Sequence, residues 1–151
     1  MPVRRLDHVS FTVLDLERSI SFWESLLGEP PTSRVEYRDP KDAEVIGYPG
    51  VRMSAAYFEF PGGTLLELFQ YVEPASAPPT SSETFVVGNA HVGLVLDDLD
   101  AACERIRAYG TEYRSAAPVP LTSGAHAGGR SIYIRDPDGI TIELLELPDH
   151  G

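Results

Sequence analysis

The chain has 151 residues and a formal net charge of −11 at pH 7, from 23 acidic and 12 basic side chains. Such an acidic chain lacks the basic surface that nucleic acids and anionic membranes require, so we expect neither as a partner. A hydrophobic content of 42% supports a packed core and excludes a disordered tail protein. The length fits one ordinary domain, or two small halves that share a core.

The cysteine content and the N-terminal composition indicate the cellular compartment. Cys103 is the single cysteine and cannot form an internal disulfide, which suits a reducing environment. Arg4 and Arg5 are not followed by the apolar run of a signal peptide, and no apolar stretch approaches the roughly 20 residues of a spanning helix. We therefore expect a cytoplasmic protein without a membrane segment.

The first elements are a strand and an amphipathic helix. Leu6 to Leu14 alternates between apolar and polar residues, and the half-polar face of this predicted strand carries His8. Asp15 is a typical N-cap, and Gly28 is a typical residue just beyond a helix end. Between them, apolar side chains recur at helical spacing at Leu16, Ile20, Trp23 and Leu27.

The next region predicts further strands. Thr32 to Pro49 is charged and weakly periodic, and it predicts a short strand at Arg34–Tyr37 followed by a mobile loop. Val51–Phe60 and Thr64–Tyr71 have strand patterns and are joined by a Pro-Gly-Gly turn. The second of these strands carries a glutamate, Glu67, among apolar residues.

A proline-rich segment then separates two similar regions. Glu73 to Thr84 is rich in Pro, Ala, Ser and Thr, which is typical of an extended linker. After it, Asn89–Asp97 predicts a strand that carries His91. Asp98 can cap a helix that ends at Gly110.

A predicted hairpin follows, between Gly128 and Glu146, with its turn at Asp136-Pro137-Asp138-Gly139. Proline presets the second turn position and glycine accepts a positive φ at the fourth. Glu143 lies among the apolar residues of the second strand. An unpaired buried carboxylate would cost several kcal/mol, so we expect Glu143 to be exposed, paired or bound to a metal.

The two regions are copies of one unit. The offset in the sequence from His8 to His91 is the same as the offset between the two cap aspartates, Asp15 and Asp98. The offset from Glu67 to Glu143 is smaller, so the second copy is shorter in its middle. An internal repeat of this kind predicts two β-α-β-β-β modules. We place them at about 4–73 and 87–148, joined by a linker at about 74–86, in a single domain over 1–151.

The repeat predicts a metal site from four side chains: His8, Glu67, His91 and Glu143. Imidazole and carboxylate together suit a divalent ion such as Zn, Ni, Co, Fe or Mn. If the four converge, two coordination positions stay open for water or substrate. A strand histidine alone is more often a core or surface residue, and a strand glutamate is usually solvated. Solvated positions, however, have no reason to keep matched residue types after duplication.

Other candidates are weaker. His126 lies in a Gly/Ala-rich loop, where we expect it to be exposed to solvent; contact with a substrate is the alternative. His150 is close to the chain end, and Cys103 occupies an apolar helical position that favours a buried, inert thiol. The sequence shows neither a Ser-His-Asp arrangement nor a phosphate-binding loop.

These motifs resemble the vicinal oxygen chelate superfamily, which includes glyoxalase I, methylmalonyl-CoA epimerase, extradiol dioxygenases and bleomycin resistance proteins. The likeness is carried by Leu6-Asp7-His8-Val9-Ser10-Phe11-Thr12-Val13, Asn89-Ala90-His91-Val92-Gly93-Leu94 and Arg135-Asp136-Pro137-Asp138-Gly139-Ile140-Thr141-Ile142-Glu143. It covers nearly the whole chain. It implies an α+β fold in which tandem βαβββ modules form an open, barrel-like mixed sheet around a metal-binding cleft.

The resemblance also implies a ligand set and an assembly. Carried over by position, the ligands are the same two histidines and two glutamates, in the His/Glu/His/Glu pattern of glyoxalase I. Epimerases typically carry Gln where this chain has Glu67. A glutathione site would need basic side chains, for which Arg34, Arg38 and Arg52 are available. Family members usually dimerise, so a homodimer is implied, with ligands from one chain or from two.

We therefore expect a metal-dependent lyase, isomerase or epimerase that acts on a small carbonyl or vicinal-oxygen substrate. The metal is a Lewis acid, and Glu143 or Glu67 transfers the proton. One alternative is an Fe(II) extradiol-type dioxygenase, which would use two histidines and one carboxylate. Another is a non-catalytic small-molecule binding or antibiotic resistance protein. Bleomycin-binding members lack the metal set, which counts against that function.

Overall fold

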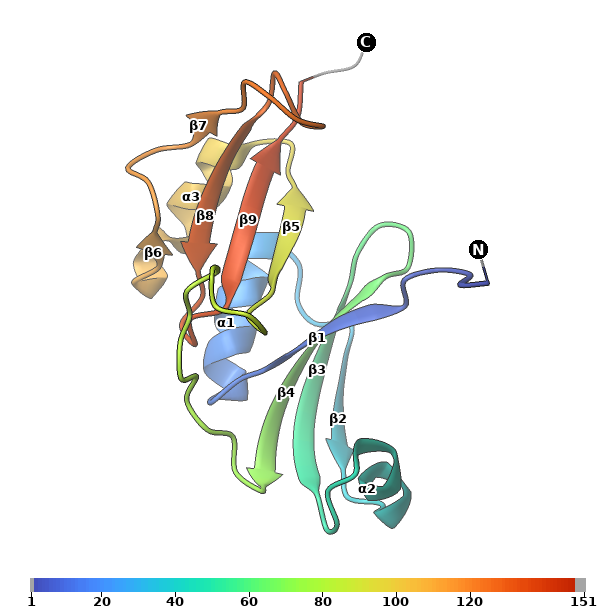
Figure 1. Cartoon of the computed structure of the whole chain (residues 1–151). Helices are drawn as coiled ribbons and strands as arrows, with labels where there is room; N and C mark the ends of the chain where they lie inside the picture. The colour runs from blue at the N-terminus through green and yellow to red at the C-terminus, as the bar shows by residue number, and fades with distance from the viewer. Residues whose placement is uncertain (1, 149–151) are drawn as a thin grey trace. The chain divides into compact units, whose positions relative to one another are not determined.

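The computed structural model describes residues 2–148, and His150 lies outside the described residues. The chain forms two compact units, Met1–Pro78 and Pro79–Gly151, which we call the N-terminal and C-terminal units (Figure 1). Each unit contains helices and one mixed sheet, and neither sheet closes into a barrel, which confirms the predicted α+β class. Within residues 2–148, no helix is both long and apolar enough to cross a membrane.

The N-terminal unit has four strands in the order β1-β4-β3-β2, with β1 parallel to β4 and the other pairs antiparallel. Figure 1 shows that the first and last strands of the unit lie side by side. The elements are β1 (His8–Thr12), α1 (Leu16–Leu27), β2 (Ser33–Tyr37), α2 (Pro40–Ile46), β3 (Arg52–Glu59) and β4 (Leu65–Glu73).

The C-terminal unit repeats this plan. Its strand order is β5-β9-β8-β6, with β5 parallel to β9, and a short strand β7 also pairs with β8. The elements are β5 (His91–Val95), α3 (Leu99–Ile106), the 3₁₀ helix η1 (Arg107–Tyr109), β6 (Glu112–Tyr113), β7 (Val119–Pro120), β8 (Arg130–Arg135) and β9 (Thr141–Glu146).

The predicted repeat is visible in the strand register. Ser10 of β1 is opposite Glu67 of β4, and Gly93 of β5 is opposite Glu143 of β9. Each histidine begins its strand two residues before that partner. Because side chains two apart in a strand point to the same face, the histidine and glutamate of each unit project from the same face of their sheet.

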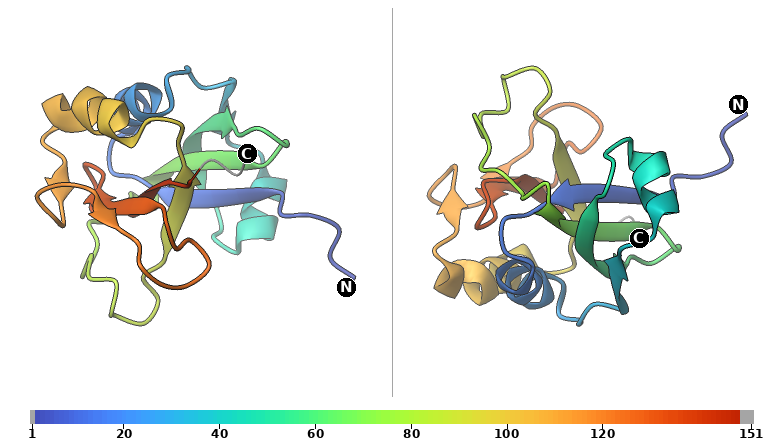
Figure 2. Two further views of the ribbon diagram at one scale, coloured as in Figure 1. Left: turned by 90° about the horizontal axis from the view of Figure 1, so that it is seen from above. Right: turned by 90° about the horizontal axis from the view of Figure 1, so that it is seen from below.

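Helix α1 forms where the sequence predicts it. The Asp15 carboxylate accepts a hydrogen bond from the Arg18 amide at 3.0 Å, and Gly28 ends the helix with φ of 80°. Trp23 is fully buried and stacks on Phe11 of β1 at a centroid distance of 6.2 Å. Figure 2 shows α1 along one side of its sheet in both views. Burial of aromatic area supplies much of the energy that holds helix and sheet together.

The predicted mobile loop after Tyr37 was wrong, because it contains helix α2. Asp39 caps the helix by accepting from the Lys41 amide at 2.9 Å, and Pro40 occupies its first turn. Gly47 ends the helix with φ of 83°. Proline in the first turn is compatible with a helix because that amide has no intrahelical acceptor. The helix buries one residue, Ala43, which explains its weak periodicity in the sequence.

The last strand of each unit holds the first turn of the helix. The Leu16 amide donates to the Gln70 side chain at 2.9 Å, and the Leu99 amide donates to the Glu146 carboxylate at 3.0 Å. Gln70 and Glu146 are equivalent positions of the repeat, because each follows its strand glutamate by three positions. Glu146 also accepts two hydrogen bonds from Arg130, at 2.9 and 3.0 Å. The hydrogen bonds from Arg130 are the main cause that lowers the pKa of the Glu146 carboxyl, and the hydrogen bond from the Leu99 amide is the second cause.

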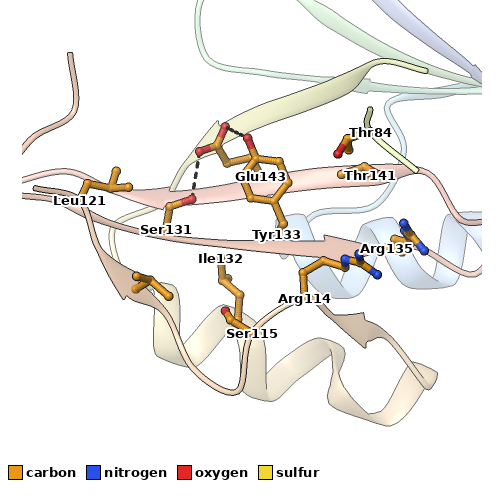
Figure 3. Close-up of a pocket in the computed structure, with 11 residues that line it drawn as sticks. Thr84, Arg114, Ser115, Leu121, Ser131, Ile132, Tyr133, Arg135, Thr141 and Glu143 are labelled. Carbon is orange, nitrogen blue, oxygen red and sulfur yellow. Dashed lines mark hydrogen bonds between the residues drawn. The ribbon is translucent and has the colours of Figure 1, made fainter. Parts of the chain in front are cut away.

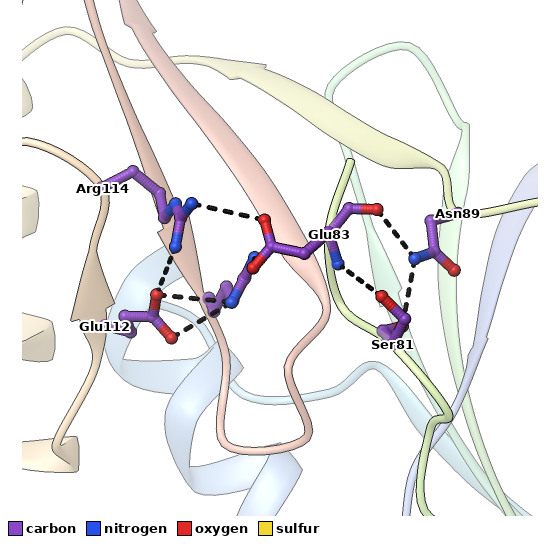
Figure 4. A network of polar contacts seen from close by, with 6 residues as sticks. Ser81, Glu83, Asn89, Glu112 and Arg114 are labelled. Atoms are coloured by element: carbon purple, nitrogen blue, oxygen red, sulfur yellow. Dashed lines mark hydrogen bonds and ion pairs between the residues drawn. The ribbon is translucent and has the colours of Figure 1, made fainter. Parts of the chain in front are cut away.

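The end of the linker is an ordered loop of the C-terminal unit. The Asn89 side-chain amide donates to the carbonyls of Ser81 and Glu83, at 3.0 and 2.9 Å. The Glu83 carboxylate forms an ion pair with Arg114 at 3.4 Å (Figure 4) and another with Arg135 at 3.0 Å. The segment is non-helical, as the sequence predicts. The ion pair between Glu83 and Arg135 of β8 connects it to the sheet.

The closing hairpin also agrees with its sequence pattern. The Asp136 carboxylate accepts from the amides of Asp138 and Ile140, at 2.9 and 2.8 Å. Gly139 has φ of 83°, which a residue with a side chain rarely adopts. The turn therefore sets the register of β8 against β9, and with it the position of Glu143.

Replacing Gly129 by alanine should destabilise the C-terminal unit. A Cβ at Gly129 would lie 2.5 Å from the Glu146 carbonyl oxygen, which is backbone and cannot move aside cheaply. We expect Gly129→Ala to lower the free energy of unfolding by about 1–3 kcal/mol, measured by urea denaturation. Gly93→Ala is the control, because its Cβ would meet a Leu145 methyl group at an ordinary 3.7 Å. If the two variants were equally stable, the predicted clash between a Cβ at Gly129 and the Glu146 carbonyl oxygen would be contradicted.

Replacing Glu146 by glutamine should reduce the dependence of the free energy of unfolding on pH in the acid range. The folded state lowers the pKa of Glu146, so its stabilisation is present above the ordinary value of 4.5 and is lost as the pH falls through the lowered value. Glu146→Gln keeps an acceptor for the Leu99 amide but loses the charge that binds Arg130. We expect the variant to be less stable than wild type at pH 7 and the difference to shrink below pH 4.5. Urea midpoints across this range measure it, and a difference independent of pH would refute it.

Candidate metal centre

The N-terminal unit brings His8 and Glu67 together. The Nε2 atom of His8 lies 3.7 Å from the Oε2 atom of Glu67. The Asp7 carboxylate lies 3.2 Å from the opposite ring nitrogen, Nδ1. A hydrogen bond from Nδ1–H to Asp7 leaves a lone pair on Nε2, the nitrogen nearer Glu67, which is the tautomer that ligation through Nε2 requires.

Glu67 lies in a largely dry environment. The residue is 9% exposed, and burial is the main cause that raises the pKa of its carboxyl; His8 opposes this shift. Tyr57 is opposite Glu67 on the neighbouring strand, but its hydroxyl forms a hydrogen bond with the Tyr37 hydroxyl. Burial and that hydrogen bond raise the pKa of Tyr57. Among residues 2–148, no hydroxyl group donates to Glu67.

The C-terminal unit brings His91 and Glu143 together in the same way. The Nε2 atom of His91 lies 3.4 Å from the Oε2 atom of Glu143. Here the carboxylate is held by two hydroxyl groups: Ser131 donates to Oε1 and Tyr133 donates to Oε2, both at 3.0 Å. Figure 3 shows these two side chains on the same side of the sheet as Glu143. Burial, followed by the hydrogen bond to Glu143, raises the pKa of Tyr133.

Glu143 lines a cavity of about 420 Å³ within the C-terminal unit. Tyr133 and Ser131 also line it, and Figure 3 shows Thr84 and Thr141 close together toward one end. Arg114 and Arg135, which hold Glu83, complete the polar part of the wall. The volume is sufficient for a small organic substrate.

The donor spacing within each pair can be compared with that of two ligands on one divalent cation. Two neighbouring donors that each lie about 2.1 Å from one cation are separated by about 3.0 Å at octahedral angles and about 3.4 Å at tetrahedral angles. The observed N···O separations of 3.4 and 3.7 Å lie at or above the upper end of this range. Each pair supplies two donors, and the described residues contain no group of three or more potential ligands close enough to hold a metal. The combination of both pairs in one site stays a prediction.

Three residues contact the predicted ligands, and the sequence patterns did not assign that role to them. Tyr133 could have been found, because the offset that relates Glu67 to Glu143 also relates Tyr57 to Tyr133. Ser131 has no such signal, since the equivalent residue is Ala55. Asp7 likewise aligns with Ala90 in the second copy.

The remaining candidates lie elsewhere. His126 is exposed, and its carbonyl accepts from the Gly129 amide at 3.1 Å. Cys103 is buried, and burial raises the pKa of its thiol, as expected for an inert cysteine. The basic residues considered for glutathione are all paired with glutamates: Arg34 with Glu17, Arg38 with Glu36, and Arg52 with Glu73.

Named relatives resemble this chain over most of its length. A lactoylglutathione lyase from Salmonella typhimurium is 32% identical, over 97% of this chain and 96% of the relative. A 2-epi-5-epi-valiolone epimerase from an Actinomyces species is 30% identical, over 93% of this chain and 78% of the relative. Both names are those of enzymes.

Solved structures share the fold. A glyoxalase-family protein from Bacillus cereus superposes with a TM-score of 0.83 at 24% identity, over 99% of this chain and 97% of that one. A glyoxalase/dioxygenase from Nostoc punctiforme gives a TM-score of 0.65 at 27% identity, over 98% and 94% of the two chains.

The sequence model of one family accounts for nearly all of these elements, since it matches residues 5–144, from just before β1 into β9. The match includes both histidines, both glutamates and the hydroxyl groups that hold Glu143. The chain belongs to the Glyoxalase/Bleomycin resistance protein/Dioxygenase superfamily.

Proposed function

We propose that the protein is a metal-dependent, glyoxalase-like enzyme that transfers a proton at a carbon next to a carbonyl group of a small substrate. The observation that supports this most directly is the pair of matched His–Glu contacts, at 3.7 Å in one unit and 3.4 Å in the other. Two copies of one donor pair at the same register position are not expected if these side chains only keep the surface in contact with water.

The two named relatives suggest the kind of reaction. A lactoyl thioester has a carbon–hydrogen bond next to its carbonyl group, and the epimerase acts on a ketone whose stereochemistry it changes. Both reactions therefore can proceed by removing a proton next to a carbonyl and returning a proton to carbon. Proton transfer of this type is therefore one reaction that is compatible with both names.

The predicted ligands would hold the cation through the Nε2 atoms of His8 and His91 and the carboxylates of Glu67 and Glu143. When bound, a divalent cation supplies Lewis acidity that stabilises the negative charge on the carbonyl oxygen as the proton leaves carbon. The hydrogen bond between His8 and Asp7 would keep that imidazole in the ligating tautomer.

The glutamates would also accept and return the proton. A carboxylate that moves a proton must lie within hydrogen-bond reach of the carbon and out of competition with bulk water. Glu67 is nearly buried, and the Glu143 side chain is 19% exposed at the wall of the cavity. Either residue can act as the proton acceptor for a substrate carbon placed beside it.

The pattern His/Glu/His/Glu resembles glyoxalase I, whereas epimerases of the superfamily typically carry Gln at the position of Glu67. The three arginines that could bind glutathione carboxylates are already paired with glutamates, so such a substrate would have to compete with those ion pairs. The two substrate types therefore need to be tested side by side.

Replacing Glu143 by glutamine should remove tight metal binding and turnover together, because a neutral amide is a much poorer metal ligand than a carboxylate. Elemental analysis of the purified protein and calorimetric titration with zinc measure the binding. We expect the affinity to fall by more than the roughly 10- to 100-fold typical of losing an outer partner of a ligand. His126→Ala is the control and should retain the metal. Full activity in Glu143→Gln would disprove the assignment.

The proposed reaction should label its substrate in heavy water. We expect the metal-loaded protein to introduce deuterium at the carbon next to the carbonyl of lactoylglutathione or of 2-epi-5-epi-valiolone, as measured by proton NMR. Glu67→Gln should slow the exchange, and removal of the metal by a chelator should stop it. Oxygen consumption with a catechol would instead favour the dioxygenase, and saturable binding without exchange would favour a binding protein.

A further inference from the structure

The two His–Glu pairs are held in place by different neighbours. In the N-terminal unit the neighbour holds the imidazole, because Asp7 contacts Nδ1 of His8 at 3.2 Å. In the C-terminal unit the neighbours hold the carboxylate, through the hydroxyl groups of Ser131 and Tyr133. The repeat does not preserve either arrangement, because Ala90 takes the place of Asp7 and Ala55 takes the place of Ser131.

We propose that Ser131 and Tyr133 are positioning residues that fix the orientation of the Glu143 carboxylate, so that the C-terminal pair is a preformed half of the metal site. This inference rests on the proposed function. It adds that metal affinity depends on the hydroxyl groups of Ser131 and Tyr133, which are not themselves ligands. This dependence is confined to the C-terminal pair.

The geometry at Glu143 restricts its last torsion angle. The terminal torsion of a glutamate is broad, so a free carboxylate samples many orientations. Here each oxygen has its own donor, with Ser131 on Oε1 and Tyr133 on Oε2, both at 3.0 Å. Rotating the carboxylate would break both hydrogen bonds. Ser131 is 6% exposed, so little water is available to replace its hydroxyl. A carboxylate ligand that is already held in one orientation loses less conformational entropy when it binds a metal.

Tyr133 also contacts the histidine of the pair. Its ring centroid lies 5.2 Å from that of His91, and its hydroxyl lies 3.4 Å from the His91 Nε2 atom. The antiparallel register places Tyr133 directly opposite Glu143, so this position is set by the backbone. One side chain therefore restrains both donors of the C-terminal pair.

The N-terminal unit contains a matched internal control. Tyr57 is opposite Glu67 at the equivalent register position, but its hydroxyl bonds to Tyr37 and not to the carboxylate. Removing the hydroxyl of Tyr57 therefore tests how much a tyrosine hydroxyl at this strand position changes metal affinity when it does not contact the carboxylate. Removing the hydroxyl of Tyr133 tests the contact with Glu143.

The experiment compares cobalt(II) binding by the 151-residue chain and four variants of it: Tyr133→Phe, Ser131→Ala, Ser131→Thr and Tyr57→Phe. Competition with a chromophoric chelator gives the affinity, and the visible absorption of bound cobalt reports its coordination. We expect Tyr133→Phe and Ser131→Ala each to weaken binding by roughly 10- to 100-fold and to alter the spectrum. Ser131→Thr restores the hydroxyl and should restore the affinity. Tyr57→Phe should bind as wild type does.

Thermal unfolding of the metal-free proteins separates positioning from folding. The four variants should unfold near the wild-type temperature, so that lost affinity reflects the site. If wild type binds cobalt and both Tyr133→Phe and Ser131→Ala bind it equally well, this inference is overturned and the proposed function stands. An equal loss in Tyr57→Phe also overturns it. If folded wild-type protein binds no cobalt, the proposed function and this inference fail together.

Discussion

The parallel pairing of the first and last strands of each unit is the constraint on which the candidate site depends. That pairing places β1 beside β4 and β5 beside β9, although most of the chain of each unit separates the partners. It sets Ser10 opposite Glu67 and Gly93 opposite Glu143, and the histidine two residues earlier then shares a face with the glutamate. A slip of one residue in either pairing would send that glutamate to the opposite face of the sheet and separate it from its histidine.

The helices protect this register. Gln70 and Glu146 each accept a hydrogen bond from the first amide of the helix in their unit, three residues beyond the site glutamate. The strand that carries the glutamate is therefore held on one edge by a parallel partner and, three residues beyond the glutamate, by the first turn of a helix. Aromatic burial around Trp23 stabilises this packing in the N-terminal unit, and Glu146 adds an ion pair with Arg130 in the other.

Duplication has left two donor pairs with the same ligands and different surroundings. Glu67 is nearly buried and raised in pKa by that burial, whereas Glu143 is held by hydroxyl groups at the wall of a cavity. His8 has an orienting carboxylate, Asp7, whereas alanine stands at the equivalent position before His91. Such divergence is the physical route by which a symmetric fold can assign unequal roles to equivalent residues, since the neighbours of a ligand tune its basicity and freedom.

The sequence alone determined the α+β class, the two modules and the four candidate ligands, because alternation, helix caps and a repeat are local or periodic signals. Asp15, Gly28 and Gly139 each behave as their residue types predict. The same local signals did not reveal α2, which has seven residues, buries only Ala43 fully and packs Ile46 partly against the same cluster. Only the tertiary structure showed that Ser131 and Tyr133 hold Glu143 while Tyr57 turns to Tyr37. Which hydroxyl reaches which carboxylate depends on cross-strand register and side-chain direction, and these are set by contacts between residues distant in the sequence.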